Sequence, residues 1–128
     1  MHLDSHQHFW RYNPAHQVWM TDRMDVLRRD YLPDELGPLL EAAGFDGSIA
    51  VQARQMEEET RWLLELAGEH DFIRGVVGWV DLRSPALRQQ LLRYYQHPKF
   101  VGVRQICLPV RASMAKVHFA LLIYITPS

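Results

Sequence analysis

The sequence has little cysteine, little net charge and no long apolar run, and each shortage removes a class of protein. Its single cysteine, Cys107, cannot form a disulfide within the chain, which excludes a small disulfide-stapled extracellular domain. The apolar neighbours Ile106 and Leu108 favour a small buried side chain there over a catalytic thiol. Lys and Arg number 14 and Asp and Glu 15, so the net charge of −1 gives no electrostatic reason to expect nucleic acid or an anionic membrane as partner.

The apolar segments are too short to cross a bilayer as a helix. The strongest of them, Val117–Ile125, falls well short of the roughly 20 residues that a membrane helix needs. The N-terminus lacks the basic segment followed by an apolar stretch that marks a secretory signal, so we expect a cytoplasmic protein. With 48% hydrophobic and 23% charged residues, the composition is that of a folded domain.

What the chain does contain is an alternation of apolar runs with amphipathic segments. The expected strands are Leu3–His6, Ser48–Ala53, Val76–Val80 and Phe100–Arg104. The expected helices are about 33–43, about 57–68 and a third opened by Ser84 and Pro85 as cap and first residue. Pro38 argues for a later start of the first helix, because proline inside a helix removes a hydrogen bond.

Strands that alternate with helices at this spacing predict an α/β fold with a parallel sheet and right-handed crossovers. Three to four β–α units are present, whereas a closed (β/α)8 TIM-type barrel needs about 250 residues. We therefore expect the first three to four units of such a barrel, truncated. Open strand edges pair readily with other strands, so we also expect poor solubility or self-association.

Two histidines lie at the end of the first expected strand, at the edge where parallel α/β folds place their active sites. His6 and His8 have the same parity, so both imidazoles can face one point, and two imidazoles suit zinc or a similar divalent ion. Asp4 shares that parity and could support a ligand as a hydrogen-bond partner. The alternative is an incidental surface pair, because His-x-His by itself is a weak signal.

Further polar residues follow the second and fourth expected strands. Arg54 and Arg104 could bind a substrate carboxylate with two parallel hydrogen bonds, or could form salt bridges between loops. Gln52 lies at the same edge, and Trp10 could line the barrel mouth or serve only in packing. We take these four as candidate substrate-binding residues. No partner pattern assigns a role to the remaining histidines His16, His70, His97 and His118.

Several separated blocks carry a resemblance to a known family. They are Leu3–Trp10 (LDSHQHFW), 50–54 (AVQAR), 58–64 (EETRWLL), 75–82 (GVVGWVDL) and 97–104 (HPKFVGVR). In this order they resemble the amidohydrolase-related family of the amidohydrolase superfamily. The most similar branch contains sugar lactonases of the L-fuconolactone and L-rhamnonolactone types and 2-pyrone-4,6-dicarboxylate hydrolase.

The resemblance implies a hydrolase that opens a sugar lactone or related cyclic ester with an activated water, and so a small-molecule substrate. A carboxylate from the last strand of the barrel would be the general base, and that strand lies outside this chain. Metal dependence differs within the branch, so the resemblance allows His6 and His8 either to hold a divalent metal or to hydrogen-bond substrate oxygens.

The resemblance covers residues 1–104, and residues 105–128 form an apolar tail that does not align with it. Where the family usually has a histidine after Arg104, this chain has Gln105. Two hypotheses therefore stay open: a lactonase-type hydrolase, or a truncated, non-catalytic and self-associating module that lacks the general base. We expect little or no lactonase activity from the polypeptide as it stands.

Overall fold

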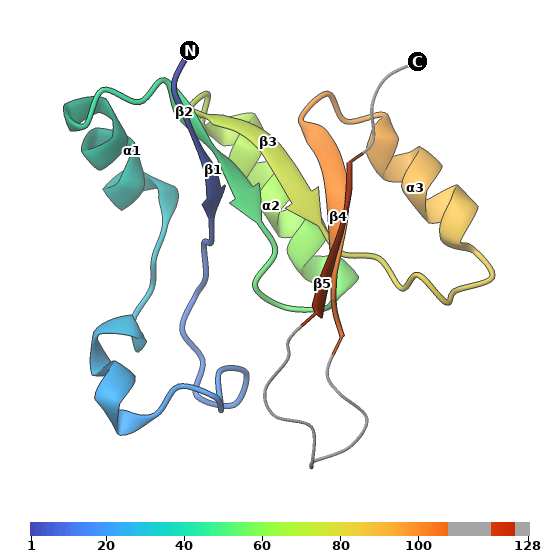
Figure 1. Ribbon diagram of the computed structural model, residues 1–128, viewed down its shortest axis with the longest axis horizontal. Helices are drawn as coiled ribbons and strands as arrows, with labels where there is room; N and C mark the ends of the chain where they lie inside the picture. Colours follow the sequence, from blue (N-terminus) through green and yellow to red (C-terminus); the bar gives the residue numbers. More distant parts are fainter. Residues whose placement is uncertain (108–118, 125–128) are drawn as a thin grey trace.

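A computed structural model describes residues 1–107 and 119–124 of the chain and shows a five-stranded sheet in the order β1-β2-β3-β4-β5 (Figure 1). The strands are β1 (Leu3–Gln7), β2 (Gly47–Val51), β3 (Ile73–Gly78), β4 (Phe100–Cys107) and β5 (Phe119–Tyr124). The first four strands are parallel to one another, which confirms the expected α/β fold and strand order. The third strand runs from Ile73 to Gly78 and so ends two residues before the expected end at Val80.

Three α-helices connect these strands: α1 (Pro33–Ala42), α2 (Glu57–Glu69) and α3 (Leu87–Tyr95). The expected start of α1 at Pro33 is confirmed, whereas the alternative of a later start was wrong, because Pro38 lies inside the helix. The expected cap of α3 was also wrong. Ser84 Oγ accepts the N–H of Ala86 at 3.1 Å and closes a turn, so the helix begins only at Leu87.

The core lies between the sheet and α2, which Figure 1 shows behind the central strands. Leu63 and Ala67 of α2 and Val76 of β3 are fully buried, and burial of a side chain the size of Leu63 or Val76 contributes about 1.5–3 kcal/mol. Thr60 of α2 approaches β3 so closely that a Cβ at Gly78 would lie 2.5 Å from its Cγ2. Glycine is needed there because of this contact.

The two edges of the sheet differ. β5 pairs antiparallel with β4 at six positions, from Gly102↔Tyr124 to Cys107↔Phe119, and so covers the β4 edge. Within the described residues, β1 pairs with β2 alone. Part of the 105–128 segment therefore belongs to the sheet, as the end of β4 and as β5. The expected burial of the Cys107 side chain lies outside the described residues.

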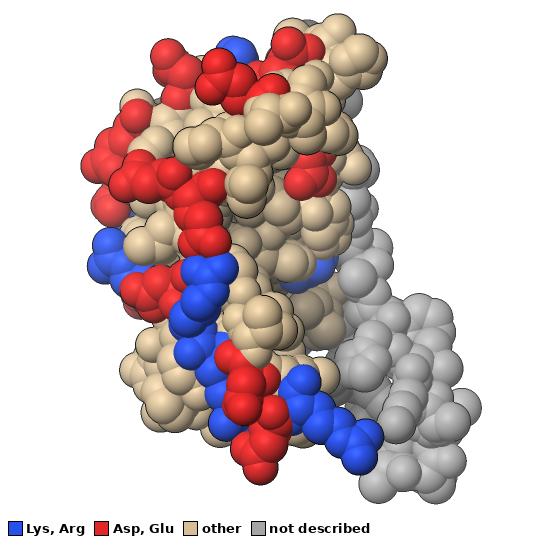
Figure 2. Space-filling view, turned by 90° about the vertical axis from the view of Figure 1, so that its left-hand side faces the viewer, with Lys and Arg blue, Asp and Glu red and all other residues tan. Residues whose placement is uncertain are grey.

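Charged side chains of both signs lie on the face shown in Figure 2. Acidic side chains dominate its upper half, and basic side chains lie next to acidic ones in its lower half. Arg28 pairs with Asp22 and Asp25 of the short 3-10 helix η1 (Asp22–Leu27), and Arg29 pairs with Glu35 of α1. Exposed pairs of this kind contribute about 0–1 kcal/mol each. None of the helices in the described part of the chain is long and apolar enough to span a membrane.

Candidate functional site at the carboxyl ends of the strands

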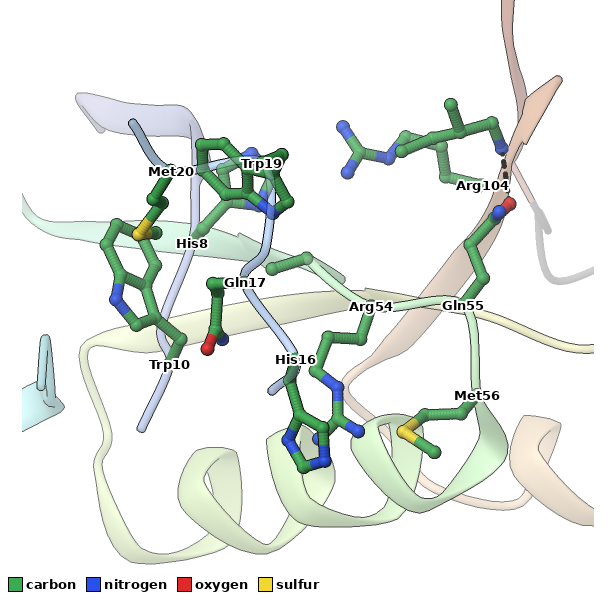
Figure 3. A pocket seen from close by; sticks show the side chains of 12 residues that line it. His8, Trp10, His16, Gln17, Trp19, Met20, Arg54, Gln55, Met56 and Arg104 are labelled. Atoms are coloured by element: carbon green, nitrogen blue, oxygen red, sulfur yellow. Dashed lines mark hydrogen bonds between the residues drawn. The ribbon is translucent and has the colours of Figure 1, made fainter. Parts of the chain in front are cut away.

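A pocket of about 780 Å³ lies at the carboxyl ends of the strands (Figure 3). It is bounded by the end of β1, the long β1–α1 connection, the β2–α2 loop and β4. The residues that line it are His8, Trp10, His16, Gln17, Trp19, Met20, Ala53, Arg54, Gln55, Met56, Arg104 and Ile106. The predicted residues His8, Trp10, Arg54 and Arg104 thus come together at one pocket.

His8 is held as a neutral imidazole with one nitrogen directed to a carbonyl. Its Nδ1–H donates to Val51 O at 2.8 Å, since a carbonyl can only accept, and this leaves a lone pair on Nε2. Burial lowers the pKa of His8, and the nearby positive charge of Arg104 lowers it further, against the hydrogen bond to Val51. The Nε2 atom of His8 is therefore available as an acceptor or as a metal ligand.

The second histidine is bound to an arginine. The rings of His6 and His8 lie 5.0 Å apart, edge to face, although a register shift interrupts the β1–β2 pairing between Asp4 and Gln7. Because a guanidinium has no acceptor, His6 Nε2 accepts from Arg104 Nη1, at 3.3 Å. The Asp4 carboxylate accepts the backbone N–H of His6 at 3.1 Å, so it orients the strand at this point.

Arg104 is oriented by Gln52, which comes from a strand two places away in the sheet. Gln52 Oε1 accepts from Arg104 Nη2 at 2.6 Å and from Nε at 3.2 Å, and the Gln52 carbonyl accepts from Nη2 as well. The Gln52 side chain is fully buried. Gln52 does not line the pocket; its amide positions the Arg104 guanidinium.

Glu59 is a site residue that the sequence reasoning missed. Its two carboxylate oxygens accept the N–H groups of Ala53 (2.9 Å) and Arg54 (2.5 Å), which fixes the loop that presents Arg54 to the pocket. Burial raises the pKa of Glu59, against these two hydrogen bonds and the positive charges of Arg54 and Arg104. The sequence signal for this role was an acidic residue in the first turn of the expected helix, where backbone N–H groups of the preceding loop need acceptors.

The β1–α1 connection supplies further pocket residues that the sequence did not assign. His16, Gln17, Trp19 and Met20 all line the cavity. Trp10 also lines it, while its indole N–H donates to Leu27 O at 3.3 Å, so this ring packs and faces the pocket at once. The length of the connection was the only sequence signal, since long loops in compact domains are often functional.

Comparisons with known proteins show which family this chain belongs to. The sequence model of the family described as "Amidohydrolase" matches residues 3–112. The chain belongs to the amidohydrolase family. This match confirms the family that the sequence blocks indicated.

Two amidohydrolase relatives are named L-fucono-1,5-lactonase. One, from Burkholderia multivorans, is 51% identical over 94 residues, covering 73% of this chain and 32% of the relative. The other, from Burkholderia ambifaria, is 37% identical over 102 residues, covering 80% and 35%. This chain thus spans about a third of the length of the curated relatives that it matches.

Solved amidohydrolase structures show the same fold. Two crystal structures of an amidohydrolase from Burkholderia multivorans match with a TM-score of 0.76 and 48% identity, over 80% of this chain and 36% of theirs. One holds bound HEPES and the other bound zinc. The fit supports the prediction that the four parallel strands are part of a TIM-type barrel.

Zinc is bound in one of these related structures, so the possible metal ligands of this chain are of interest. His8 offers Nε2, but His6 Nε2 is already bound to Arg104. Across residues 1–107 and 119–124, no group of three His, Cys, Asp or Glu could hold a metal ion. Catalytic zinc sites usually have three protein ligands, so the described residues of this chain do not complete one.

Proposed function

We propose that this chain forms the substrate-holding side of an active site in which water opens a sugar lactone. The observation that carries the proposal is the convergence of His6, His8, Arg54 and Arg104 at the carboxyl ends of parallel strands, where barrel enzymes bind substrates. The lactonase names of two relatives support the choice of substrate class.

In this proposal the two arginines bind the oxygens that carry charge. Water adds its oxygen to the lactone carbonyl carbon and the ring C–O bond breaks. One proton of the water goes to the released alkoxide, and the other is released when the new carboxylic acid ionises to an aldonate. Negative charge grows first on the carbonyl oxygen, and hydrogen-bond donors held in place before the reaction stabilise it. Arg104, fixed by Gln52, is such a donor, and Arg54 provides a second cation for the carboxylate of the product.

The proposed reaction also needs a general base that activates the water. No Asp or Glu is among the described residues that line the pocket, so the carboxylate that activates water is expected from outside residues 1–107. General acid–base help contributes roughly 10²–10⁴-fold in rate, and the chain alone should therefore hydrolyse lactone only slowly. A divalent metal could take His8 Nε2 as one ligand, but the described residues do not complete a metal site, so no step here depends on a metal.

Binding of the ring-opened product tests this function. We expect the chain to bind L-fuconate in isothermal titration calorimetry, and Arg104→Met to weaken binding about tenfold or more, since hydrogen bonds to charged groups are strong. Arg54→Met should act in the same direction. Arg88→Met removes the same charge from an exposed position of α3 and is the matched control. Equal affinity in all three variants, or no binding, would contradict the proposal.

The second candidate, a self-associating module, is favoured by one observation. Since β5 covers the β4 edge, β1 is the sheet edge left without a second neighbour in the described part of the chain. An exposed strand edge can pair with the same edge of a second copy. Because each copy would have one such edge, the pairing would give a closed dimer with two-fold symmetry. Light scattering that shows a monomer at all concentrations would reject this candidate.

A further inference from the structure

The β1–α1 connection contains a compact loop, residues 13–20, that is held by its own hydrogen bonds. The Asn13 carbonyl accepts the N–H groups of His16 (2.9 Å) and Gln17 (3.0 Å), and the Asn13 N–H donates to Gln17 Oε1 at 2.8 Å. The Met20 N–H donates to the Gln17 carbonyl at 3.0 Å. The loop is therefore shaped without a ligand, and binding does not have to order it.

Two buried side chains and an arginine anchor this loop. Gln17 is 5% exposed and Met20 4% exposed, although both belong to a surface connection. Arg28 donates to the Met20 carbonyl at 2.9 Å and is itself paired with Asp22 and Asp25. The loop is thus tied to η1 as well as to itself.

Trp19 is the large apolar side chain at the tip of this anchored loop. It stays 57% exposed, yet it lines the pocket, whereas its neighbour Val18 is 81% exposed and does not. Figure 3 shows Trp19 on one side of the opening, with Arg104 and Gln55 on the other. One wall of the pocket is therefore aromatic and the facing wall carries hydrogen-bond donors.

We propose that Trp19 determines the preference of the pocket for a closed, saturated ring. The face of an indole is electron-rich and apolar, so it suits the C–H face of a pyranose-type ring, while Arg104 binds ring oxygens from the opposite wall. An open-chain acid has no such face and depends on the arginines alone. This assignment rests on the proposed lactonase function for the identity of the ligand.

The test compares a ring sugar with an open-chain acid in ligand-observed NMR titrations of the whole chain. The probes are L-fucose, a neutral pyranose that does not hydrolyse, and L-fuconate. Trp19→Ala should weaken L-fucose binding about tenfold and change L-fuconate binding less than about twofold. Trp19→Phe keeps an aromatic face and should recover most of the affinity. Val18→Ala, one residue away and outside the pocket, should leave both affinities unchanged.

The outcomes separate this inference from the function on which it rests. If L-fuconate binds and Arg104→Met weakens it, but Trp19→Ala leaves L-fucose affinity unchanged, the role of Trp19 is wrong and the proposed function stands. An equal loss for both ligands in Trp19→Ala also overturns it, because a general disturbance of the pocket would do the same. If neither ligand binds the wild-type chain, the proposed function and the Trp19 assignment both fail.

Discussion

Replacement of Gln52 by leucine tests whether the Arg104 guanidinium is positioned from β2. Leucine has a similar volume, so the change removes the amide without leaving a large cavity. Gln52 Oε1 accepts two N–H groups of Arg104, at 2.6 and 3.2 Å, and hydrogen bonds to charged groups contribute about 1.5–3 kcal/mol each. The Arg104 side chain is only partly buried, so water replaces part of this loss. We expect Gln52→Leu to lower the free energy of unfolding by about 2–3 kcal/mol.

Urea unfolding followed by circular dichroism measures this loss. Gln52→Glu is the control, because it keeps an oxygen acceptor next to the guanidinium, and it should stay within about 1 kcal/mol of the wild type near neutral pH. Gln52→Leu should also weaken L-fuconate binding, although Gln52 does not line the pocket. A Gln52→Leu variant within about 0.5 kcal/mol of the wild type, with unchanged ligand affinity, would refute the positioning role.

Two further predictions concern α2. Thr60 Oγ1 donates to the Trp79 carbonyl and accepts the Trp79 N–H, both at 2.7 Å, so Thr60→Val should destabilise the chain by about 2–4 kcal/mol in urea while Thr60→Ser keeps most of the stability. Because the pKa of Glu59 is raised, the folded state holds the Glu59 proton more tightly than the unfolded state does. Glu59 therefore stabilises the fold at pH values below its ordinary pKa of about 4.5, and this stabilisation is lost as the pH rises through its pKa in the folded state. Thermal unfolding from pH 4 to 7 should show this fall in the wild type relative to Glu59→Gln; parallel curves would contradict it.

The fold was predictable where local pattern and burial agree. The parallel strands are apolar runs such as Ile49–Val51, which only a sheet covered on both faces accepts. Helix starts were less predictable, because Ser84 and Pro85 satisfy the rules for a cap but form a turn before α3. The antiparallel pairing of β5 with β4 depends on a free edge of the sheet and not on any period in the sequence.

The candidate site was predictable only in part, for a physical reason. The shared parity of His6 and His8 indicated a common location, and their rings do lie 5.0 Å apart. The sequence did not indicate which hydrogen bonds connect the residues of the site. Arg104 bonds to both His6 and Gln52, although the residues are far apart in the chain and two or three strands apart in the sheet. Such contacts depend on the order and register of the strands in the sheet, which no local pattern encodes.

We propose that the pocket at the carboxyl ends of the strands binds sugar acids and lactones. Titration of ¹⁵N-labelled chain with L-fuconate, followed by amide and arginine side-chain NMR signals, tests it most directly. We expect the largest shifts at Arg54, Arg104 and His8, with saturation at one affinity for all three. Shifts confined to other regions, such as the groove between β1 and α1 near Leu36 and Leu39, or no shifts at all, would contradict the claim.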